Sequence, residues 1–304
     1  MKTIIFLIML TFLAFPTGSD WCYSSPECGP STWSSTPYCN GTQQSPVNII
    51  TSATTVNTSL GSFNFIGYSD ASKLSHITNT GEAVIVYMSD GVVINGGGLS
   101  GNYTALQFHL HWGNGTSSPG SEHAIDGQRY VMEMHIVHIK QGLSNLEVAK
   151  QQKGIAVLSF LIDVDKSNSN SAWDTLSSYL ETISLPGSVN RTNFTLSISS
   201  LIKQVNTTKY YRYHGSLTTP TCDEAVTWTI FQSPVLVSPN VVNAFASKVF
   251  RDNPARTPLV NNYRPTQNLN GRQIQVTQSG SQKAAASVRV SLLGMVLLSL
   301  LSYR

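Results

Sequence analysis

The 304-residue sequence has little charge and little cysteine. Only 12% of its residues are charged, its formal net charge is +3, and it contains no run of Lys or Arg. Nucleic-acid-binding surfaces carry such basic clusters, so we expect no nucleic acid among the partners of this chain. The four cysteines form no Cys-x-x-Cys pair, which argues against a zinc ribbon. No repeat or linker interrupts residues 20–278, and we predict one domain there.

The N-terminal apolar segment has the pattern of a secretory signal. Lys2 precedes the apolar residues 4–15, and Pro16, Thr17, Gly18 and Ser19 follow them. This order predicts a signal peptide over residues 1–19. The alternative is an N-terminal membrane anchor, but a bilayer span needs roughly 20 apolar residues.

The C-terminal segment has the order of a glycosylphosphatidylinositol (GPI) attachment signal. Ser279, Gly280 and Ser281 are small, a spacer covers residues 282–289, and an apolar tail covers residues 290–301. We predict lipid attachment at Ser279 and removal of residues 280–304, which leaves residues 20–279 as the mature domain with a short stalk. The alternatives are attachment within residues 284–286 and a short transmembrane helix. The predicted location is the extracellular face of the plasma membrane.

Cysteines and glycosylation sequons agree with a secreted chain. An even number of cysteines predicts two disulfide bonds in an oxidising compartment, and three pairings are open. The cysteines are Cys22, Cys28, Cys39 and Cys222. Asn-x-Ser/Thr sequons without an intervening proline mark surface segments, and we expect glycans on some of them. They begin at Asn40, Asn57, Asn102, Asn114, Asn190, Asn193 and Asn206.

The middle of the chain reads mainly as strand. Segments rich in β-branched and aromatic residues, separated by Gly and Asn, cover residues 81–89, 91–95, 129–140, 154–164 and 225–231. Residues 170–183 and 238–250 have helical spacing, and Ser238 and Pro239 fit a helix start. Residues 165–171 form a polar loop. The predicted fold is mixed α/β but mainly β: a large, twisted, mostly antiparallel central sheet with a few peripheral helices.

The stretch "ALQFHLHWG" (105–113) raises the question of a metal. Side chains alternate between the two faces of a strand, so Gln107, His109 and His111 share one face, while Phe108 and Leu110 share the other. Two imidazoles on one face can supply two nitrogen ligands. A catalytic zinc commonly takes three protein ligands, so a third is expected from a neighbouring strand.

The segment "VMEMHIVHIK" (131–140) offers that third ligand. Glu133, His135 and Val137 share one face, and His138 lies on the other. His135 is the candidate ligand, whereas His138 is predicted to be a hydrogen-bonded core histidine. Glu133 can accept the ring proton of His135 and so fix its tautomer. Gln107, which shares a face with His109, can accept the ring proton of His109 in the same way.

Seven segments resemble the α-class carbonic anhydrases, over about residues 20–277. In chain order they are "QQSPVNI", "FHLHWG", "SEHAIDGQRY", "MEMHIVH", "GIAVLSFL", "SLTTPTCDEAVTW" and "NNYRPTQNLNGRQI". "WCYSSPEC" and the C-terminal tail are most similar to the GPI-anchored, isoform-IV-like branch of that family. This branch implies the disulfides Cys22–Cys28 and Cys39–Cys222, and the family implies its own fold for the predicted sheet.

The resemblance implies zinc-dependent, reversible hydration of carbon dioxide to bicarbonate and a proton. It assigns His109, His111 and His135 as ligands of Zn²⁺. Neutral imidazoles leave the metal its positive charge, which lowers the pKa of a bound water to near 7. It further implies that Thr218 accepts a hydrogen bond from the reacting water and that Glu122 orients Thr218.

Other residues receive supporting roles from the same resemblance. Thr219 is expected to contact bicarbonate, and Asn262 is expected to support the ligands. Carbon dioxide has no dipole, so an apolar wall beside the metal suits it. The implied wall residues, for which core packing is the alternative reading, are Val137, Val157, Leu217 and Trp228.

One position departs from the family pattern. Glu82 stands where fast family members carry a histidine that transfers protons to buffer, and Thr80 replaces a pocket asparagine. Histidine titrates near neutral pH, whereas glutamate ordinarily titrates near 4.3, so we expect slower turnover of the same reaction. His76 shares strand parity with Glu82 and is predicted to lie roughly 20 Å from it, at the rim or surface.

A second class of function stays open at this point. Some family members lack the zinc ligands, so a catalytically slow, carbonic-anhydrase-like surface binding module is the alternative. A surface zinc-binding protein with vestigial activity is a third reading. The intact ligands and the Thr218–Glu122 pair favour the enzyme. Its expected partners are carbon dioxide, bicarbonate, the membrane through a GPI anchor, and bicarbonate transporters, and we expect a monomer.

Overall fold

The computed structural model describes residues 21–167 and 170–278. The predicted signal peptide (1–19), Ser279 and the predicted propeptide (280–304) lie outside these ranges, as does part of the predicted polar loop at 165–171. Within them, no helix has the length and apolar character needed to cross a membrane.

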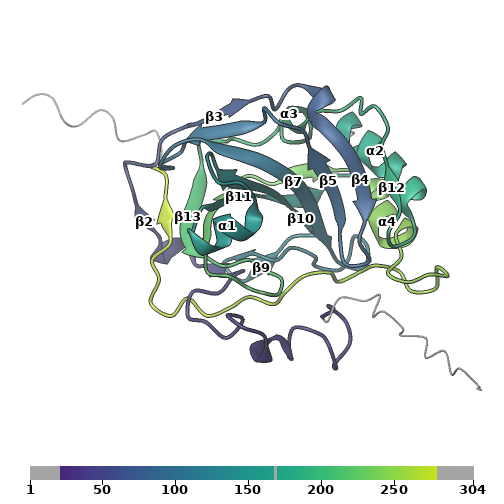
Figure 1. The fold of residues 1–304 in the computed structure, drawn as a ribbon, viewed down its shortest axis with the longest axis horizontal. Helices are drawn as coiled ribbons and strands as arrows, with labels where there is room; N and C mark the ends of the chain where they lie inside the picture. Colours follow the sequence, from purple (N-terminus) through teal and green to yellow (C-terminus); the bar gives the residue numbers. More distant parts are fainter. Residues whose placement is uncertain (1–20, 168–169, 279–304) are drawn as a thin grey trace, which may run out of the picture.

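The described residues are built around a large mixed sheet of 13 strands. Its main path runs β12–β4–β5–β7–β10–β11–β14–β13–β16–β2, and β3, β6 and β15 pair beside this path. Most neighbours are antiparallel; the parallel pairs are β11 with β14, β11 with β15, and β16 with β2. The expected fold class is confirmed (Figure 1). The strands are β2 Thr55–Val56, β3 Phe63–Ile66, β4 Leu74–Asn79, β5 Val84–Met88, β6 Val93–Gly96, β7 Tyr103–Trp112, β10 Met132–Lys140, β11 Ile155–Val164, β12 Val189–Asn190, β13 Tyr210–Gly215, β14 Val226–Phe231, β15 Val235–Val237 and β16 Gln275–Val276.

A smaller sheet and several short helices complete the described fold. The smaller sheet joins β1, β8 and β9, and its strands are β1 Asn48–Ile49, β8 Ala124–Ile125 and β9 Gln128–Arg129. The α-helices are α1 Leu146–Gln151, α2 Ser171–Ser178, α3 Ile198–Leu201 and α4 Pro239–Lys248. The 3-10 helices are η1 Trp33–Ser35, η2 Thr51–Ala53, η3 Ala71–Lys73 and η4 Tyr179–Ile183.

Each of the five predicted strand segments overlaps a strand, and both predicted helices form. The helix expected at 170–183 is α2 followed directly by η4, because its last turn tightens to 3-10 geometry. Ser238 and Pro239 stand at the start of α4 as predicted, although the Ser238 side chain makes no capping hydrogen bond. Helices α1 and α3 were not predicted; both are short, with six and four residues.

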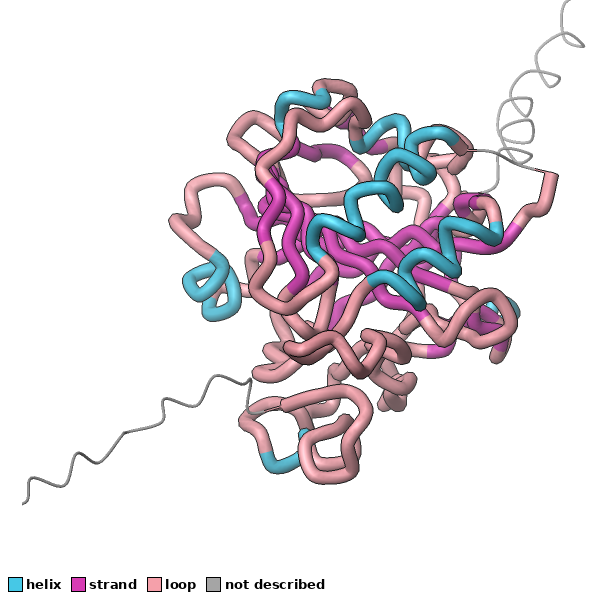
Figure 2. The backbone as a smooth tube through the Cα atoms, turned by 90° about the vertical axis from the view of Figure 1, so that its right-hand side faces the viewer, coloured by secondary structure: helices cyan, strands magenta, loops and turns pink. Residues whose placement is uncertain are grey.

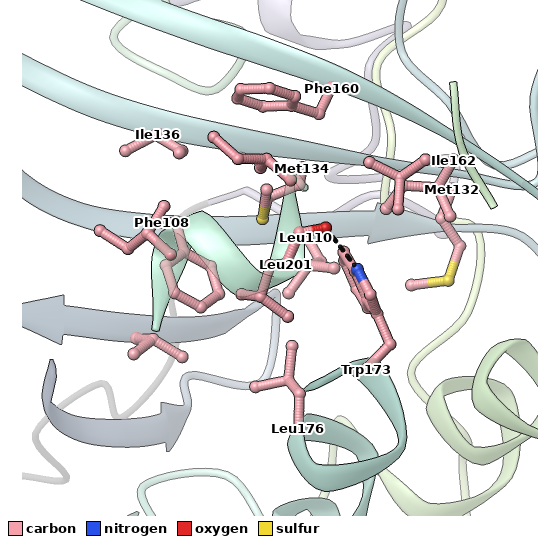
Figure 3. Close-up of a cluster of buried hydrophobic side chains, with 14 of the residues drawn as sticks. Phe108, Leu110, Met132, Met134, Ile136, Phe160, Ile162, Trp173, Leu176 and Leu201 are labelled. Atoms are coloured by element: carbon pink, nitrogen blue, oxygen red, sulfur yellow. Dashed lines mark hydrogen bonds between the residues drawn. The ribbon is translucent and has the colours of Figure 1, made fainter. Parts of the chain in front are cut away.

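Two hydrophobic cores lie on opposite faces of the sheet. The larger core packs one face of β7, β10 and β11 against helices α2 and α4, which Figure 2 shows in front of the strands. Phe108 and Leu110 belong to this core, so the predicted alternation along β7 is confirmed. In the close-up of Figure 3, the Trp173 indole N–H donates a 3.0 Å hydrogen bond to the Leu201 carbonyl. Burial of one large apolar side chain contributes about 1.5–3 kcal/mol, so packing in these layers stabilises the sheet.

Two disulfide bonds are present, with the pairing that the resemblance implies. Cys22–Cys28 closes a local loop, and Cys39–Cys222 joins residues 183 positions apart. The second bond ties the N-terminal segment to the loop after β13, which also carries Thr218. A cross-link between such distant residues stabilises the fold mainly by restricting the unfolded chain.

Candidate metal centre

The pairing of β7 with β10 brings three histidine rings together. The strands are antiparallel, and the register sets His135 opposite His109 and Glu133 opposite His111. The ring centroids of His111 and His135 lie 4.7 Å apart, and His109 lies 5.0 Å and 5.3 Å from these two rings. One nitrogen of each ring lies within 4.8 Å of the others. Two strands of opposite direction therefore supply three nitrogen donors at one point of the sheet.

Each of the three rings has one nitrogen held by a hydrogen-bond acceptor. Since an acceptor oxygen requires an N–H opposite it, the proton of each neutral ring lies on the held nitrogen. The other three nitrogens, His109 Nε2, His111 Nε2 and His135 Nδ1, then carry lone pairs. The held pairs are His109 Nδ1 with Gln107 Oε1 at 2.9 Å, His111 Nδ1 with the Asn262 carbonyl at 2.7 Å, and His135 Nε2 with Glu133 Oε1 at 2.6 Å.

The donor set fits a divalent cation. His111 Nε2 and His135 Nδ1 lie 3.1 Å apart, so two lone pairs face each other without a proton between them in the neutral tautomers. Burial lowers the pKa of His111 to about 4 and also lowers the pKa of His135, which keeps both rings neutral near pH 7. Burial likewise holds the pKa of His109 well below its ordinary value. Three neutral imidazoles with converging lone pairs are the ligand set of a catalytic zinc site.

The Glu133 carboxylate organises a buried hydrogen-bond network below His135. Its Oε1 also accepts from Ser159 Oγ at 2.6 Å, and its Oε2 accepts the backbone N–H groups of Glu122 and His123, both at 2.8 Å. Burial opposes ionisation of this carboxyl, but His123 and His135 outweigh it and hold the pKa of Glu133 well below its usual range. The carboxylate is therefore ionised and can accept a hydrogen bond from the His135 Nε2–H.

His123 is a functional-site residue that the sequence analysis missed. Its Nδ1 lies 2.7 Å from Glu133 Oε1 and its Nε2 lies 2.7 Å from the Tyr213 hydroxyl. A second group of His123, Glu133 and His135 has the spacing of a metal site, but both His123 nitrogens are already engaged. We therefore interpret His123 as a support of Glu133. Its place beside Glu122 in "SEH" was the available signal, since the chain has only seven histidines.

The fold also brings Thr218 and Glu122 to this site. Both are buried. Glu122 Oε1 accepts the backbone N–H of Arg264 at 2.8 Å, and Oε2 lies 3.5 Å from His111 Nε2. Burial raises the pKa of Glu122, while His135, the Arg264 N–H and the Thr218 hydroxyl act in the opposite direction. Thr218 is therefore a neighbour of Glu122 at the metal centre, although 96 residues separate the two in sequence (218 − 122).

An apolar row lies beside His135 on the same face. Val137 pairs with Gln107 on one side and with Val157 on the other, and Val157 pairs with Trp228. The Trp228 ring centroid lies 4.8 Å from that of His135. Leu217 packs against the hydrophobic core that contains Val137, Val157 and Trp228. The half-buried Thr219 lies in the same loop as Leu217, after β13.

The position of Glu82 differs from the sequence-based expectation in one respect. Thr80 N–H donates to the Ala83 carbonyl at 3.0 Å, so residues 80–83 form a turn and Glu82 lies beyond the end of β4. The expected strand parity between His76 and Glu82 is therefore wrong. His76 lies on β4, where its ring stacks on Tyr87 at 4.7 Å. His138 is buried between the Tyr68 hydroxyl at 2.6 Å and the Ala156 carbonyl at 3.2 Å, so its prediction as a core histidine is confirmed.

Residues 262–264 form a frame behind the site. The Asn262 carbonyl holds His111, its side-chain Oδ1 accepts from Trp112 N–H at 2.8 Å, and its Nδ2 donates to the Glu82 carbonyl at 3.2 Å. Arg264 holds Glu122 through its backbone, as described above. The segment thus fixes a histidine and a carboxylate from different parts of the chain.

Comparison with known proteins agrees with this geometry. The sequence model of the eukaryotic-type carbonic anhydrases matches residues 28–278. The chain belongs to this family. Carbonic anhydrase 4 of Oryctolagus cuniculus is 40% identical over 272 residues, which cover 86% of this chain and 85% of the relative. Carbonic anhydrase 15 of Mus musculus is 34% identical, covering 93% and 90%, and carbonic anhydrase 12 of Homo sapiens is 33% identical, covering 89% and 76%.

The activity and the cofactor of this carbonic anhydrase follow from its membership of the family. Eukaryotic-type carbonic anhydrases are zinc enzymes that interconvert carbon dioxide and bicarbonate. In this chain His109, His111 and His135 form a group able to bind a metal. The expectation of an enzyme is therefore confirmed.

Proposed function

We propose that this carbonic anhydrase hydrates carbon dioxide at the extracellular face of the membrane, with His109, His111 and His135 as the zinc ligands. The observation that supports this assignment most strongly is the set of three neutral rings, each held by an acceptor on one nitrogen with its other nitrogen directed to one point. Bound Zn²⁺ would supply an acidified water, with a pKa near 7 instead of 15.7.

The residues around the ligands would then orient the reactants. An ionised Glu122 would accept a hydrogen bond from the Thr218 hydroxyl, so that the Thr218 oxygen can accept a hydrogen bond from the reacting water and fix the direction of that water. Val137, Val157, Leu217 and Trp228 would exclude water from the side on which carbon dioxide approaches. The backbone and side chain of Thr219 lie in the loop that would contact the bicarbonate product. Gln107, Glu133 and Asn262 would hold the ligand rings in their tautomers.

Two substitutions separate metal binding from orientation. His135→Ala removes one of three ligands and should lose zinc and hydration together. Thr218→Ala should retain zinc while hydration falls by roughly 10²-fold, since it removes a group that acts on the reacting water. Zinc content by atomic absorption and stopped-flow hydration give the two readouts. Stoichiometric zinc with normal turnover in His135→Ala would overturn the ligand assignment.

The proposed location rests on the chain ends. Residues 1–19 would be removed as a signal peptide, residues 280–304 would be removed on GPI attachment at Ser279, and some of the seven sequons would carry glycans. Treatment of intact cells with phosphatidylinositol-specific phospholipase should release active enzyme. Retention of a form that still contains residues 290–301 would contradict the anchor.

The proposal also covers the partners of the anchored enzyme. We infer a monomer that exchanges bicarbonate with transporters in the same membrane. Light scattering of the released protein checks the monomer, and proximity labelling on cells checks the transporters.

A further inference from the structure

A stacked pair of side chains joins two segments that hold residues of the metal centre. The first segment is the hairpin at residues 121–130, whose strands β8 and β9 pair antiparallel. Its first arm carries Glu122 and its second arm carries Arg129. The second segment is the frame at residues 262–264. The Arg129 guanidinium lies over the Tyr263 ring, with its Cζ 3.9 Å from the ring centroid, so this contact links the hairpin to the frame.

Both sequence neighbours of Tyr263 bond to residues of the metal centre. The His111 Nδ1–H donates to the Asn262 carbonyl at 2.7 Å, and the Arg264 backbone N–H donates to Glu122 Oε1 at 2.8 Å. Glu122 is therefore held twice: its backbone belongs to the hairpin, and its carboxylate is bound by the frame. The direction of this carboxylate depends on how closely the frame lies against the hairpin.

The Arg129 guanidinium has no other partner that would explain its burial. Its Nε and Nη2 are buried and have no hydrogen-bond partner among the described residues. No carboxylate oxygen of residues 21–167 and 170–278 lies within 4.0 Å of it. Buried donors without acceptors lower stability, so an apolar side chain would serve the fold better at this position. The attraction between a cation and the face of an aromatic ring, which is stronger where water is excluded, is what holds the guanidinium on Tyr263.

The other arginines that stack on rings in the described residues are held differently. Their Cζ atoms lie 5.6–5.9 Å from the ring centroids, and each of these arginines also donates hydrogen bonds. They are Arg212, Arg264 and Arg272. Arg129 thus combines the shortest ring contact of this group with two unpaired donors.

We propose that Arg129 and Tyr263 are positioning residues for the hydration of carbon dioxide, and that their stack holds the frame against the hairpin that carries Glu122. This inference rests on the proposed roles of His111 and Glu122. With Oε1 held by the frame, Glu122 Oε2 lies 3.5 Å from His111 Nε2, the nitrogen proposed to bind zinc. Displacement of the frame would turn the carboxylate that orients Thr218 and would loosen the hydrogen bond that fixes the His111 ring.

Hydration kinetics in dilute buffer separate positioning from a general loss of folded enzyme. The ratio kcat/KM reports the conversion of carbon dioxide, whereas kcat in dilute buffer is expected to be limited by proton return at Glu82. Loss of positioning should therefore lower kcat/KM more than kcat. A smaller folded fraction would instead lower both by the same factor. The rate of zinc release to a chromophoric chelator gives a second readout that does not depend on activity.

Three substitutions in the zinc-loaded enzyme test the stack. Tyr263→Leu removes the ring, and Arg129→Met removes the cation together with its unpaired donors. Each should lower kcat/KM and accelerate zinc release by about fivefold or more, while Arg129→Met should keep the thermal unfolding temperature of the wild type. Tyr263→Phe keeps the ring and should stay within about twofold of the wild type in both measurements. The double variant Arg129→Met/Tyr263→Leu should be no worse than the more affected single variant, because both changes break one contact.

Arg212→Met is the matched control. Arg212 is also buried and stacks on aromatic rings, but it lies outside the hairpin and the frame. Its replacement should lower the unfolding temperature without changing kcat/KM per bound zinc or the rate of zinc release. Equal losses of kcat/KM and zinc retention in Arg212→Met would assign the effect to general destabilisation and would overturn the inference.

The remaining outcomes are equally decisive. Wild-type kcat/KM and zinc release in both Tyr263→Leu and Arg129→Met would overturn the inference, as would losses that multiply in the double variant. The variant His135→Ala, measured beside them, tests the proposed function itself. Zinc retention in His135→Ala would overturn the ligand assignment and this inference with it. Loss of zinc in His135→Ala beside unaltered stack variants would overturn this inference alone.

Discussion

Replacement of Glu133 by Gln tests how much of the metal centre depends on one buried carboxylate. The carboxylate accepts five hydrogen bonds, from the side chains of His135, His123 and Ser159 at 2.6–2.7 Å and from two backbone N–H groups at 2.8 Å. A glutamine has one acceptor oxygen, so its amide NH₂ must face one of these two sets of donors. In either orientation at least two hydrogen bonds to an ionised group are lost. At about 1.5–3 kcal/mol each, the free energy of unfolding should fall by about 3–6 kcal/mol.

The same change should weaken metal binding, because it alters the tautomer of His135. When the amide NH₂ faces His135 Nε2, that nitrogen becomes the acceptor and the ring proton moves to Nδ1, which the proposed ligand set needs unprotonated. Loss of such a supporting partner typically costs 10–100-fold in metal affinity. Competition with a chromophoric chelator measures zinc affinity, and urea unfolding of the chelator-treated protein measures stability.

A matched variant on the neighbouring strand provides the control. Gln107→Glu makes the reverse exchange beside His109 and leaves an acceptor oxygen for His109 Nδ1, so zinc affinity should be retained. Ser159→Ala removes one donor to the ionised Glu133 and should lower stability by about 1.5–3 kcal/mol. Wild-type zinc affinity together with wild-type urea resistance in Glu133→Gln would refute the reasoning.

Three further predictions follow from particular residues. Glu82→His should raise kcat by roughly tenfold in dilute buffer with little change in kcat/KM, because imidazole returns the product proton near neutral pH better than a carboxylate does; equal kcat at low buffer in stopped-flow assays would contradict this. Burial lowers the pKa of His138 from 6.5 to about 4, so the unfolded chain binds a proton that the folded protein does not, and stability should decrease as pH falls between these values, by up to about 3 kcal/mol. In pH-dependent urea unfolding, His138→Gln should remove that part of the slope, and an unchanged slope would exclude His138 as its source. Glycopeptide mapping should find lower occupancy at Asn57, whose side-chain amide donates to Gln275 at 2.9 Å, than at the exposed Asn206; the reverse order would show that this contact does not limit glycosylation.

Much of the sheet and the metal centre could be predicted from local sequence. The period-two alternation of "LQFHLHW" assigns His109 and His111 to one face because a strand has no other way to orient successive side chains. The β-branched and aromatic runs of β10, β11 and β14 identify strands for the same local reason. The roles of Thr218 and Glu122 came from family resemblance, since neither an isolated threonine nor an isolated glutamate has a local signal.

Sequence alone failed where function depends on distant contacts. His123 was not recognised, because its importance lies in reaching Glu133 and the Tyr213 hydroxyl, ten and ninety residues away. The parity argument for His76 assumed a continuous strand, but a turn at residues 80–83 ends β4 before Glu82.

The sequence by itself determined which residue types stand on each strand and which face they share, because backbone geometry fixes side-chain alternation within a strand. It therefore determined that histidines at 109, 111 and 135 could supply metal ligands. Only the tertiary structure decided the register that sets His135 opposite His109 and which ring nitrogens keep lone pairs. It also decided the hydrogen bond between the Asn262 carbonyl and His111. These depend on hydrogen bonds between segments far apart in the chain, whose pairing is selected by the packing of the whole sheet between its two cores.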